Sequence, residues 1–206
     1  MMKKIIFLFF LLSITIGILQ AQEVYIQMGK NYTKYLFSAE TNELPTFTAD
    51  VGNSYTLGFS TLKSNDSPFF LDFGLSINEY NAKGYYGLEN LEYKTNYAGL
   101  FTALNCRIIY SKQNCLAISA GISTQSIVQG NQKINNSNDN LMKQEEFKGL
   151  VLGPKLGLKY TYAINNDINL LVDYGYSKHW NLTYSGTQKL SINNHGIHFG
   201  FSINMY

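Results

Sequence analysis

The chain has 206 residues, of which 16 are Lys or Arg and 14 are Asp or Glu, so its formal net charge is only +2. This near balance excludes a nucleic-acid binder, which needs an excess of basic side chains on one face. Aromatic residues, led by 16 tyrosines, make up 15% of the chain and charged residues another 15%. That composition is unusual for a soluble helical enzyme and fits strands with aromatic ends.

Residues 1–21 are predicted to be a secretory signal peptide. Two lysines precede a mainly apolar run from Ile5 to Ile16, and small and polar residues surround Ala21. The run is shorter than the ~20 residues of a membrane-spanning helix, so we expect cleavage after Ala21. The predicted domain is therefore residues 22–206. Its charge is neutral, because removal of the two lysines leaves 14 basic residues against 14 acidic ones.

Eight runs of alternating apolar and polar residues follow, separated by connections that are in turn long and short. They cover residues 24–35, 54–62, 69–80, 93–110, 115–128, 149–162, 168–177 and 191–206. Alternation with a period of two predicts strands. Short turns at one end and long loops at the other predict an all-β fold, an eight-stranded antiparallel up-and-down transmembrane β-barrel. The connections at 81–90 and 131–148 are expected to be loops, the second because it is the most polar segment.

The two faces of these strands differ in residue type. One face carries mainly Gly and Ser with a few charges, as in Ser54, Gly58 and Ser60, which suits the crowded lumen of a narrow barrel. The other is apolar, as in Leu57, and is expected to meet lipid. Tyrosines near the strand ends are expected to form interfacial girdles. They are Tyr80, Tyr93, Tyr110, Tyr160, Tyr162, Tyr174 and Tyr176.

Lys30 does not fit this division, because its position in the alternation places it on the lipid side near mid-height. A lysine at the bilayer midplane of a barrel costs ~2–4 kcal/mol. Either a bulge beside Gly29 shifts the alternation or Lys30 lies closer to an interface. The last run, "HFGFSINMY", carries its apolar stripe almost to the final residue. We expect it to close the barrel by pairing with the first strand.

Five charged residues fall on the lumen face and are predicted to form a lumen charge network: Arg107, Asp72, Asp173, Lys155 and Lys159. Such a network is either an ion-selective constriction or a packed set of salt bridges that fills the lumen and fixes strand register. Eight strands enclose an interior just wide enough for side chains, which favours the packed network.

No other constellation indicates chemistry. His179 is expected in the last loop near Ser177, with no acid nearby in the sequence, so we expect no catalytic residues, no cofactor and no enzymatic activity. His195 and His198 point to opposite faces of a strand, which argues against a metal site. Cys106 and Cys115 are expected out of register and on opposite faces, Cys106 facing Ser119, so a disulfide is not expected.

Three aromatic residues, Tyr85, Tyr86 and Trp180, are expected in the long loops, where they either contact a partner or belong to solvated caps. The alternation and glycines of "YIQMGKNYTKY", "GPKLGLKYTYAI" and "HGIHFGFSINMY" are similar to small outer-membrane barrels. The chain resembles those of the OmpX and OmpA-barrel kind, and especially the PorT-like β-barrel proteins of the porin family. The resemblance implies an outer-membrane location, and PorT itself is linked to protein secretion.

These observations together predict a monomeric outer-membrane barrel in contact with membrane lipid, with both termini in the periplasm. We expect a structural or surface-interaction role through the external loops. The alternatives are a narrow ion or small-solute channel, an accessory component of protein secretion, and a soluble lipocalin-like carrier. The partners expected are surface or secretion proteins, not nucleic acid.

Overall fold

The computed structural model describes residues 21–38, 46–61, 67–86, 89–135, 137–182 and 189–205, so residues 1–20 of the predicted signal peptide lie outside the described residues. The elements are β1 (Ala21–Ser38), β2 (Thr46–Thr61), β3 (Phe69–Tyr86), β4 (Glu89–Tyr110), β5 (Asn114–Ile134), β6 (Ser137–Asn140), the 3-10 helix η1 (Leu141–Lys143), β7 (Leu150–Ala163), β8 (Ile168–Asn181) and β9 (Lys189–Asn204). Among these residues no helix is long and apolar enough to cross a membrane.

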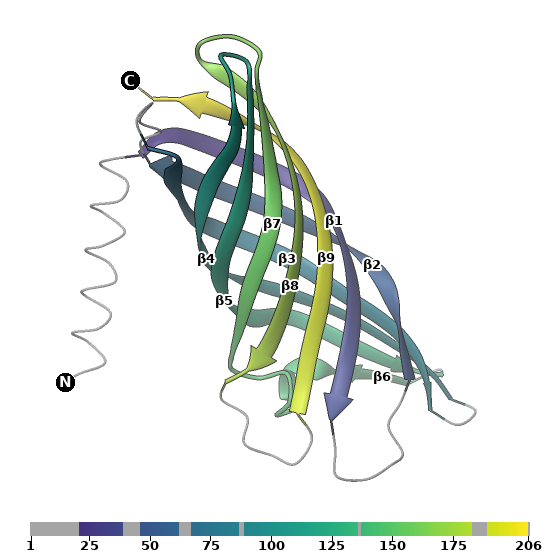
Figure 1. Cartoon of the computed structure of the whole chain (residues 1–206). Coiled ribbons are helices and arrows are strands. Elements are labelled where there is room, and N and C mark those ends of the chain that lie inside the picture. The colour runs from purple at the N-terminus through teal and green to yellow at the C-terminus, as the bar shows by residue number, and fades with distance from the viewer. Residues whose placement is uncertain are drawn as a thin grey trace, which may run out of the picture.

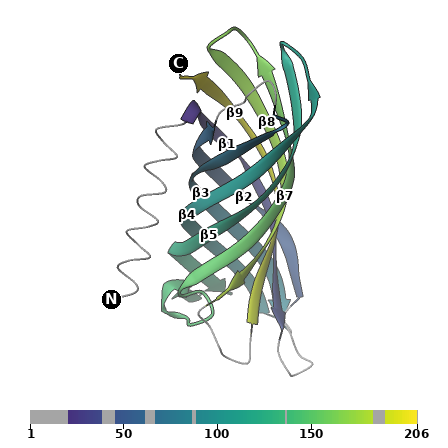
Figure 2. The same cartoon turned by 60° about the vertical axis from the view of Figure 1, so that its left-hand side comes forward.

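Eight antiparallel strands form a closed ring in the order β1, β2, β3, β4, β5, β7, β8, β9 (Figure 1). The last strand pairs with the first over sixteen residues, from Glu23 opposite Asn204 to Ser38 opposite Lys189. Figure 2 shows the tilted strands from a second side. The predicted eight-stranded up-and-down barrel, closed by its last strand, is confirmed. Closure matters because it leaves no unpaired strand edge in the ring.

The two ends of the barrel differ. We call the end that holds the start of β1 and the close of β9 the terminal end; it lies at the top of Figure 1 and carries the short β4–β5 and β7–β8 hairpins. We call the opposite end, which carries β6 and η1, the distal end. Tyr206 lies outside the described residues.

The strands continue further toward the distal end than the sequence predicts. β3 runs to Tyr86 and β4 begins at Glu89, so the loop predicted at 81–90 is mostly a paired hairpin. The prediction of a loop at 131–148 is also wrong, because β5 continues to Ile134 and is followed by β6 and η1. Cross-strand pairing provides hydrogen bonds for the backbone N–H and C=O groups of these polar segments. Because the segments have no alternating hydrophobic pattern, the sequence does not predict this pairing.

The predicted division of the two faces is confirmed. Ser54 and Ser60 point into the lumen and are at most 1% exposed, whereas Leu75 and Phe199 point outward and are more than half exposed. Soluble monomers rarely expose a continuous apolar surface of this kind. The outer wall is therefore suited to a hydrocarbon environment.

The tyrosines divide between the two faces. Five of the predicted girdle residues point outward: Tyr110, Tyr160, Tyr162, Tyr174 and Tyr176. The prediction is wrong for Tyr80 and Tyr93, which are 2% and 6% exposed and lie inside the distal end. Their strand positions share the inward face with Asn78 and Thr95, so the strand pleat turns both rings into the lumen.

Lys30 lies on the outer face without a bulge beside it. The pairing of β1 with β2 and with β9 runs through Gly29 without a register shift. The Lys30 ammonium donates to Asn53 Oδ1 at 2.7 Å, and Asn53 Nδ2 donates to Glu79 Oε2 at 2.8 Å. Polar groups on two neighbouring strands thus accompany the lysine on the outer wall.

The two cysteines are not bonded to each other. Tyr110 faces Cys115, but Cys106 faces Ile118 and not Ser119 as the sequence predicts. The difference is one residue, because β4 has a register shift between Arg107 and Ile109. Cys115 is buried, while Cys106 is half-buried on the outer face.

Candidate functional site

An ion pair crosses the lumen in its terminal half. Lys159 Nζ of β7 lies 2.7 Å from Asp72 Oδ2 of β3, and both side chains are almost fully buried. Ser60 donates its hydroxyl to the other oxygen of the Asp72 carboxylate. The ammonium also lies 4.3 Å from the ring centroid of Tyr25. The site thus satisfies both charges, as a buried ion pair requires.

Asp173 lies beside this pair on β8, directly across the β7–β8 ladder from Lys159. Its carboxylate accepts a hydrogen bond from Gln27 Nε2 at 2.7 Å. Lys155 is on the same face of β7 as Lys159 and borders the same internal cavity as Asp173. The structure therefore gathers four of the five predicted network residues around one cavity.

Arg107 does not line this cavity but lies near it, since the Phe70 ring has Lys159 Nζ 5.8 Å from its centroid and Arg107 at a similar distance. Its guanidinium carbon is 4.9 Å from the ring centroid of Tyr110 and 5.9 Å from that of Phe70. The Asp72 carboxylate binds Lys159 and Ser60. Which cation lies close to Asp72 depends on the cross-strand register of every strand in the ring, and this register cannot be predicted from the sequence.

Sequence reasoning did not single out the contribution of β1 to this site. Glu23, Tyr25 and Gln27 all point inward and are buried. Glu23 accepts from Asn169 Nδ2 at 3.5 Å. The signal was present in the sequence, because the three residues share the inward alternation of Asn31 and Thr33.

The internal cavity is small. Its volume is about 80 Å³, and its lining includes Asn31, Lys155, Asp173, His179 and His198. A water molecule occupies about 30 Å³ of liquid, so the space suits two or three waters. It is too small for a typical small-molecule site of about 300–1,000 Å³.

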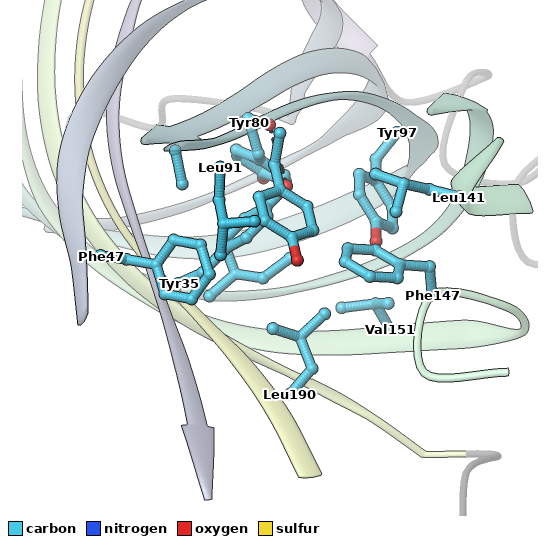
Figure 3. Packing of buried hydrophobic residues seen from close by; sticks show 12 residues of the cluster. Tyr35, Phe47, Tyr80, Leu91, Tyr97, Leu141, Phe147, Val151 and Leu190 are labelled. Carbon is cyan, nitrogen blue, oxygen red and sulfur yellow. Dashed lines mark hydrogen bonds between the residues drawn. The ribbon is translucent and has the colours of Figure 1, made fainter. Parts of the chain in front are cut away.

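The distal end of the lumen is filled by an aromatic cluster (Figure 3). Rings from three strands meet there: Tyr93 lies 5.7 Å from Tyr35 and 5.2 Å from Phe47 between centroids. Phe147, which follows η1 in the chain, stacks on Tyr93 at 5.9 Å. Side chains from opposite walls thus touch across the lumen at this level.

The segment after β6, residues 141–149, folds over this cluster, and we call it the cap. Leu141 and Phe147 are buried completely or nearly so. Asn140 begins the cap by accepting a hydrogen bond from the Met142 amide at 2.9 Å. Asn181 of β8 holds the other side, donating to the Glu146 carbonyl at 2.9 Å and to the Lys148 carbonyl at 2.6 Å. The cap is therefore packed and hydrogen-bonded to the barrel, unlike the predicted solvated loop.

The terminal end is open by comparison. A polar hollow of about 500 Å³, which we call the vestibule, lies between the two hairpins and the ends of β1 and β9. Its lining is rich in amides: Asn114, Asn165, Asn166, Asn169 and Asn204. The lumen is thus wide and polar at one end and packed at the other.

His179 lies in β8 and not in a loop, which corrects the sequence prediction. Its Nε2 is 3.1 Å from Ser123 Oγ, and its ring packs against Tyr80 at 5.4 Å between centroids. The imidazole is 1% exposed. In the described residues no carboxylate hydrogen-bonds to this imidazole, and no three His, Cys, Asp or Glu side chains gather as a metal site would require.

The predicted loop contacts do not form one surface. Tyr85 is 63% exposed on β3 and Trp180 is 40% exposed on β8. Three strands separate β3 from β8 in either direction around the ring, so the two side chains are on opposite walls. The Tyr86 side chain is not among the described parts of the structure.

A closed eight-stranded ring with an apolar outer wall and a polar, largely filled lumen defines the class: the chain has the fold of the small outer-membrane β-barrels. It is similar to the outer membrane protein OprG from Pseudomonas aeruginosa, with a TM-score of 0.52 and 12% identity over 91% of this chain and 97% of that one. Neisserial surface protein A is similar with a TM-score of 0.47 and 14% identity, over 88% and 97%. Ail of Yersinia pestis is similar with a TM-score of 0.37 and 10% identity, over 87% of this chain and 99% of that one. No protein-family model and no curated protein matches the sequence.

Proposed function

We propose that this chain is a non-enzymatic, non-conducting protein of the outer membrane whose distal rim contacts partners outside the cell. The observation that carries the proposal is the cap, whose Leu141 and Phe147 side chains close the distal lumen. A closed lumen leaves the rim as the part of the molecule available to partners. Exposed segments on a rigid scaffold are where binding functions concentrate.

The outer wall supports the membrane placement. Its exposed apolar rows are continuous around the ring and carry Ile26, Leu57, Leu75, Leu156 and Phe201. With the start of β1 and the end of β9 at the terminal end, this end would face the periplasm and the distal end would face outward. The soluble carrier is disfavoured because a lipocalin-like barrel needs a polar outer wall.

The filled lumen argues against the channel alternative. An ion crossing the barrel would have to pass the Lys159–Asp72 pair and then the Tyr35, Phe47 and Tyr93 rings. Both obstacles are made of packed side chains, which in eight-stranded barrels occupy the whole cross-section.

Planar-bilayer recording of the purified, folded chain tests the proposal. We expect no steady conductance. Folding is checked in parallel by heat-modifiable mobility on a gel, and membrane integration by resistance to an alkaline wash. Steady, sizeable currents from the folded protein would overturn the non-conducting assignment. Loss of the chain from the membrane fraction would overturn the membrane placement.

A second candidate is an accessory role in protein secretion, as in the PorT-like proteins that the sequence resembles. The vestibule favours it, since a polar hollow of about 500 Å³ facing the periplasm could receive part of a periplasmic protein. Deletion of the gene tests this role. Unchanged export of other secreted proteins would exclude it.

A further inference from the structure

The outer surface of β8, β9 and β1 changes character on the way to the distal end. Near the terminal end the three strands pair in one apolar row, made by Ile168, Ile203 and Val24. Ten residues further along each strand they pair in a polar row, made by Lys178, Asn193 and Lys34. The two lysines lie two strands apart, about 10 Å at ~4.8 Å per strand.

The polar row lies at the height of lipid head groups if the apolar rows span the bilayer. Ten residues at ~3.4 Å each, on strands tilted by ~40°, rise about 26 Å along the barrel axis. The apolar band of outer-membrane barrels is about 25 Å tall. Lys34 and Lys178 therefore stand where the distal leaflet ends.

The charged side chains on the outer face of this wall are basic. Within the described residues, the outward positions of β7, β8, β9 and β1 carry no Asp or Glu. On the next strands around the ring, lysines are matched with acids: Lys83 of β3 lies 3.3 Å from Asp50 of β2, and Lys94 of β4 lies 3.2 Å from Glu92 of the same strand. Asp50 pairs with Thr33, next to Lys34, but its carboxylate lies against Lys83. Hydrogen bonds connect a further carboxylate to this region: Asn53 links Glu79 to Lys30, which lies four residues before Lys34 on β1 and closer to the apolar rows.

Aromatic side chains surround the two lysines. Lys178 Nζ lies 5.6 Å from the ring centroid of Trp180. His195 Nδ1 and the Tyr174 hydroxyl are 2.9 Å apart, and the Tyr176 ring lies 4.9 Å from the His195 ring. Amphipathic rings of this kind favour the boundary between hydrocarbon and head groups.

We propose that this surface, which we call the basic row (Lys34 and Lys178 with Tyr176, Trp180 and His195), binds a phosphorylated lipid head group of the distal leaflet. The proposal rests on the membrane placement proposed above. Two cations about 10 Å apart match a head group with two phosphates better than one with a single phosphate. The basic row is continuous with the apolar wall, so the acyl chains of the same lipid lie against Phe199 and its neighbours.

Titration of the folded full-length chain in detergent micelles with diphosphorylated lipid A tests this surface. Trp180 is the single tryptophan of the chain, so its fluorescence reports binding at the site itself. We expect saturable binding, and weaker binding of monophosphorylated lipid A. Inorganic phosphate is not expected to displace the lipid; displacement would indicate a small-anion site and overturn the lipid assignment.

Neutralisation of both lysines, Lys34→Gln with Lys178→Gln, is expected to weaken binding about 25-fold, at roughly fivefold per lysine. The matched control is Lys83→Gln with Lys94→Gln on β3 and β4, where both lysines are paired with acids, and it should bind as the unchanged protein does. Equal loss in the control, or equal binding of dephosphorylated lipid, would overturn the proposal. Gel mobility and alkaline wash of each variant test folding and membrane placement independently of lipid binding. If the barrel folds in the membrane but binds phosphorylated and dephosphorylated lipid equally, only the lipid-binding inference is contradicted.

Discussion

Lys159 and Asp72, 87 residues apart in the sequence, meet inside the barrel at 2.7 Å between Nζ and Oδ2. Their strands, β7 and β3, are separated in the ring by β4 and β5, so the pair links two parts of the wall that share no backbone hydrogen bonds. Tyr25 and Ser60 complete its surroundings from β1 and β2. One ion pair thus joins four strands.

Removal of one partner of this pair should destabilise the barrel strongly. Lys159→Met leaves the Asp72 carboxylate buried without its cation, and the expected loss is about 3–5 kcal/mol in the free energy of unfolding. Urea unfolding of the folded chain in lipid vesicles measures it. Lys94→Met, which breaks the exposed pair with Glu92, should cost no more than about 1 kcal/mol. Equal effects of the two changes would contradict a structural role for the buried pair.

The cap should loosen when its aromatic anchor is shortened. Phe147→Ala removes the ring that stacks on Tyr93, and a buried Phe→Ala change costs about 3–5 kcal/mol. Because the cap lies outside the strand ring, we expect local opening, seen as faster trypsin cleavage at Lys143 and Lys148 of the intact barrel. Met142→Ala, at an exposed position of the same cap, is the control and should leave cleavage unchanged.

Gly58 provides the space in which the Tyr25 ring lies. A Cβ atom there would stand 2.2 Å from Tyr25 Cζ, far inside contact distance. Gly58→Ala should therefore displace the ring that packs on Lys159 and lower the free energy of unfolding by about 1–3 kcal/mol. Gly175→Ala meets only the flexible end of Lys155 and should cost less. Denaturant titration of both variants gives their free energies of unfolding. A larger loss of stability for Gly175→Ala than for Gly58→Ala would contradict the prediction.

A charge on the outer wall distinguishes a membrane barrel from a soluble one. Phe199 is more than half exposed in the middle of the apolar rows. Phe199→Arg should destabilise the barrel in a bilayer by about 2–4 kcal/mol, because arginine is poorly tolerated near the midplane. Vesicle refolding followed by gel mobility gives the folded fraction, with Lys83→Arg as the control. A neutral or stabilising effect would indicate that this wall faces water.

Much of the barrel could be predicted because the strand pleat acts locally. Successive side chains point to opposite faces whatever the neighbouring strand is, so most of the small polar residues and the apolar residues separate as predicted. Phe70 and Leu171 are exceptions, since they are apolar and buried inside the barrel. Tyr80 and Tyr93 were expected outside from their amphipathic chemistry, but they follow the pleat inward and meet the cap.

The candidate site could likewise be predicted only in part. The inward direction of Asp72 and Lys159 follows from alternation alone, while their contact depends on the pairing of every strand between them. The register shift between Arg107 and Ile109, which places Cys106 opposite Ile118, shows how a bulge changes such pairings without an obvious sequence signal.

The sequence by itself therefore determined the strand number and the two faces, since both follow from a period of two and from residue type. Only the tertiary structure decided which lumen charges meet, because ring closure sets that distance. It also decided that a polar segment packs as a cap. Leu141 and Phe147 are buried because they pack on aromatic rings of strands that are distant in the sequence, and the local sequence pattern does not predict this contact.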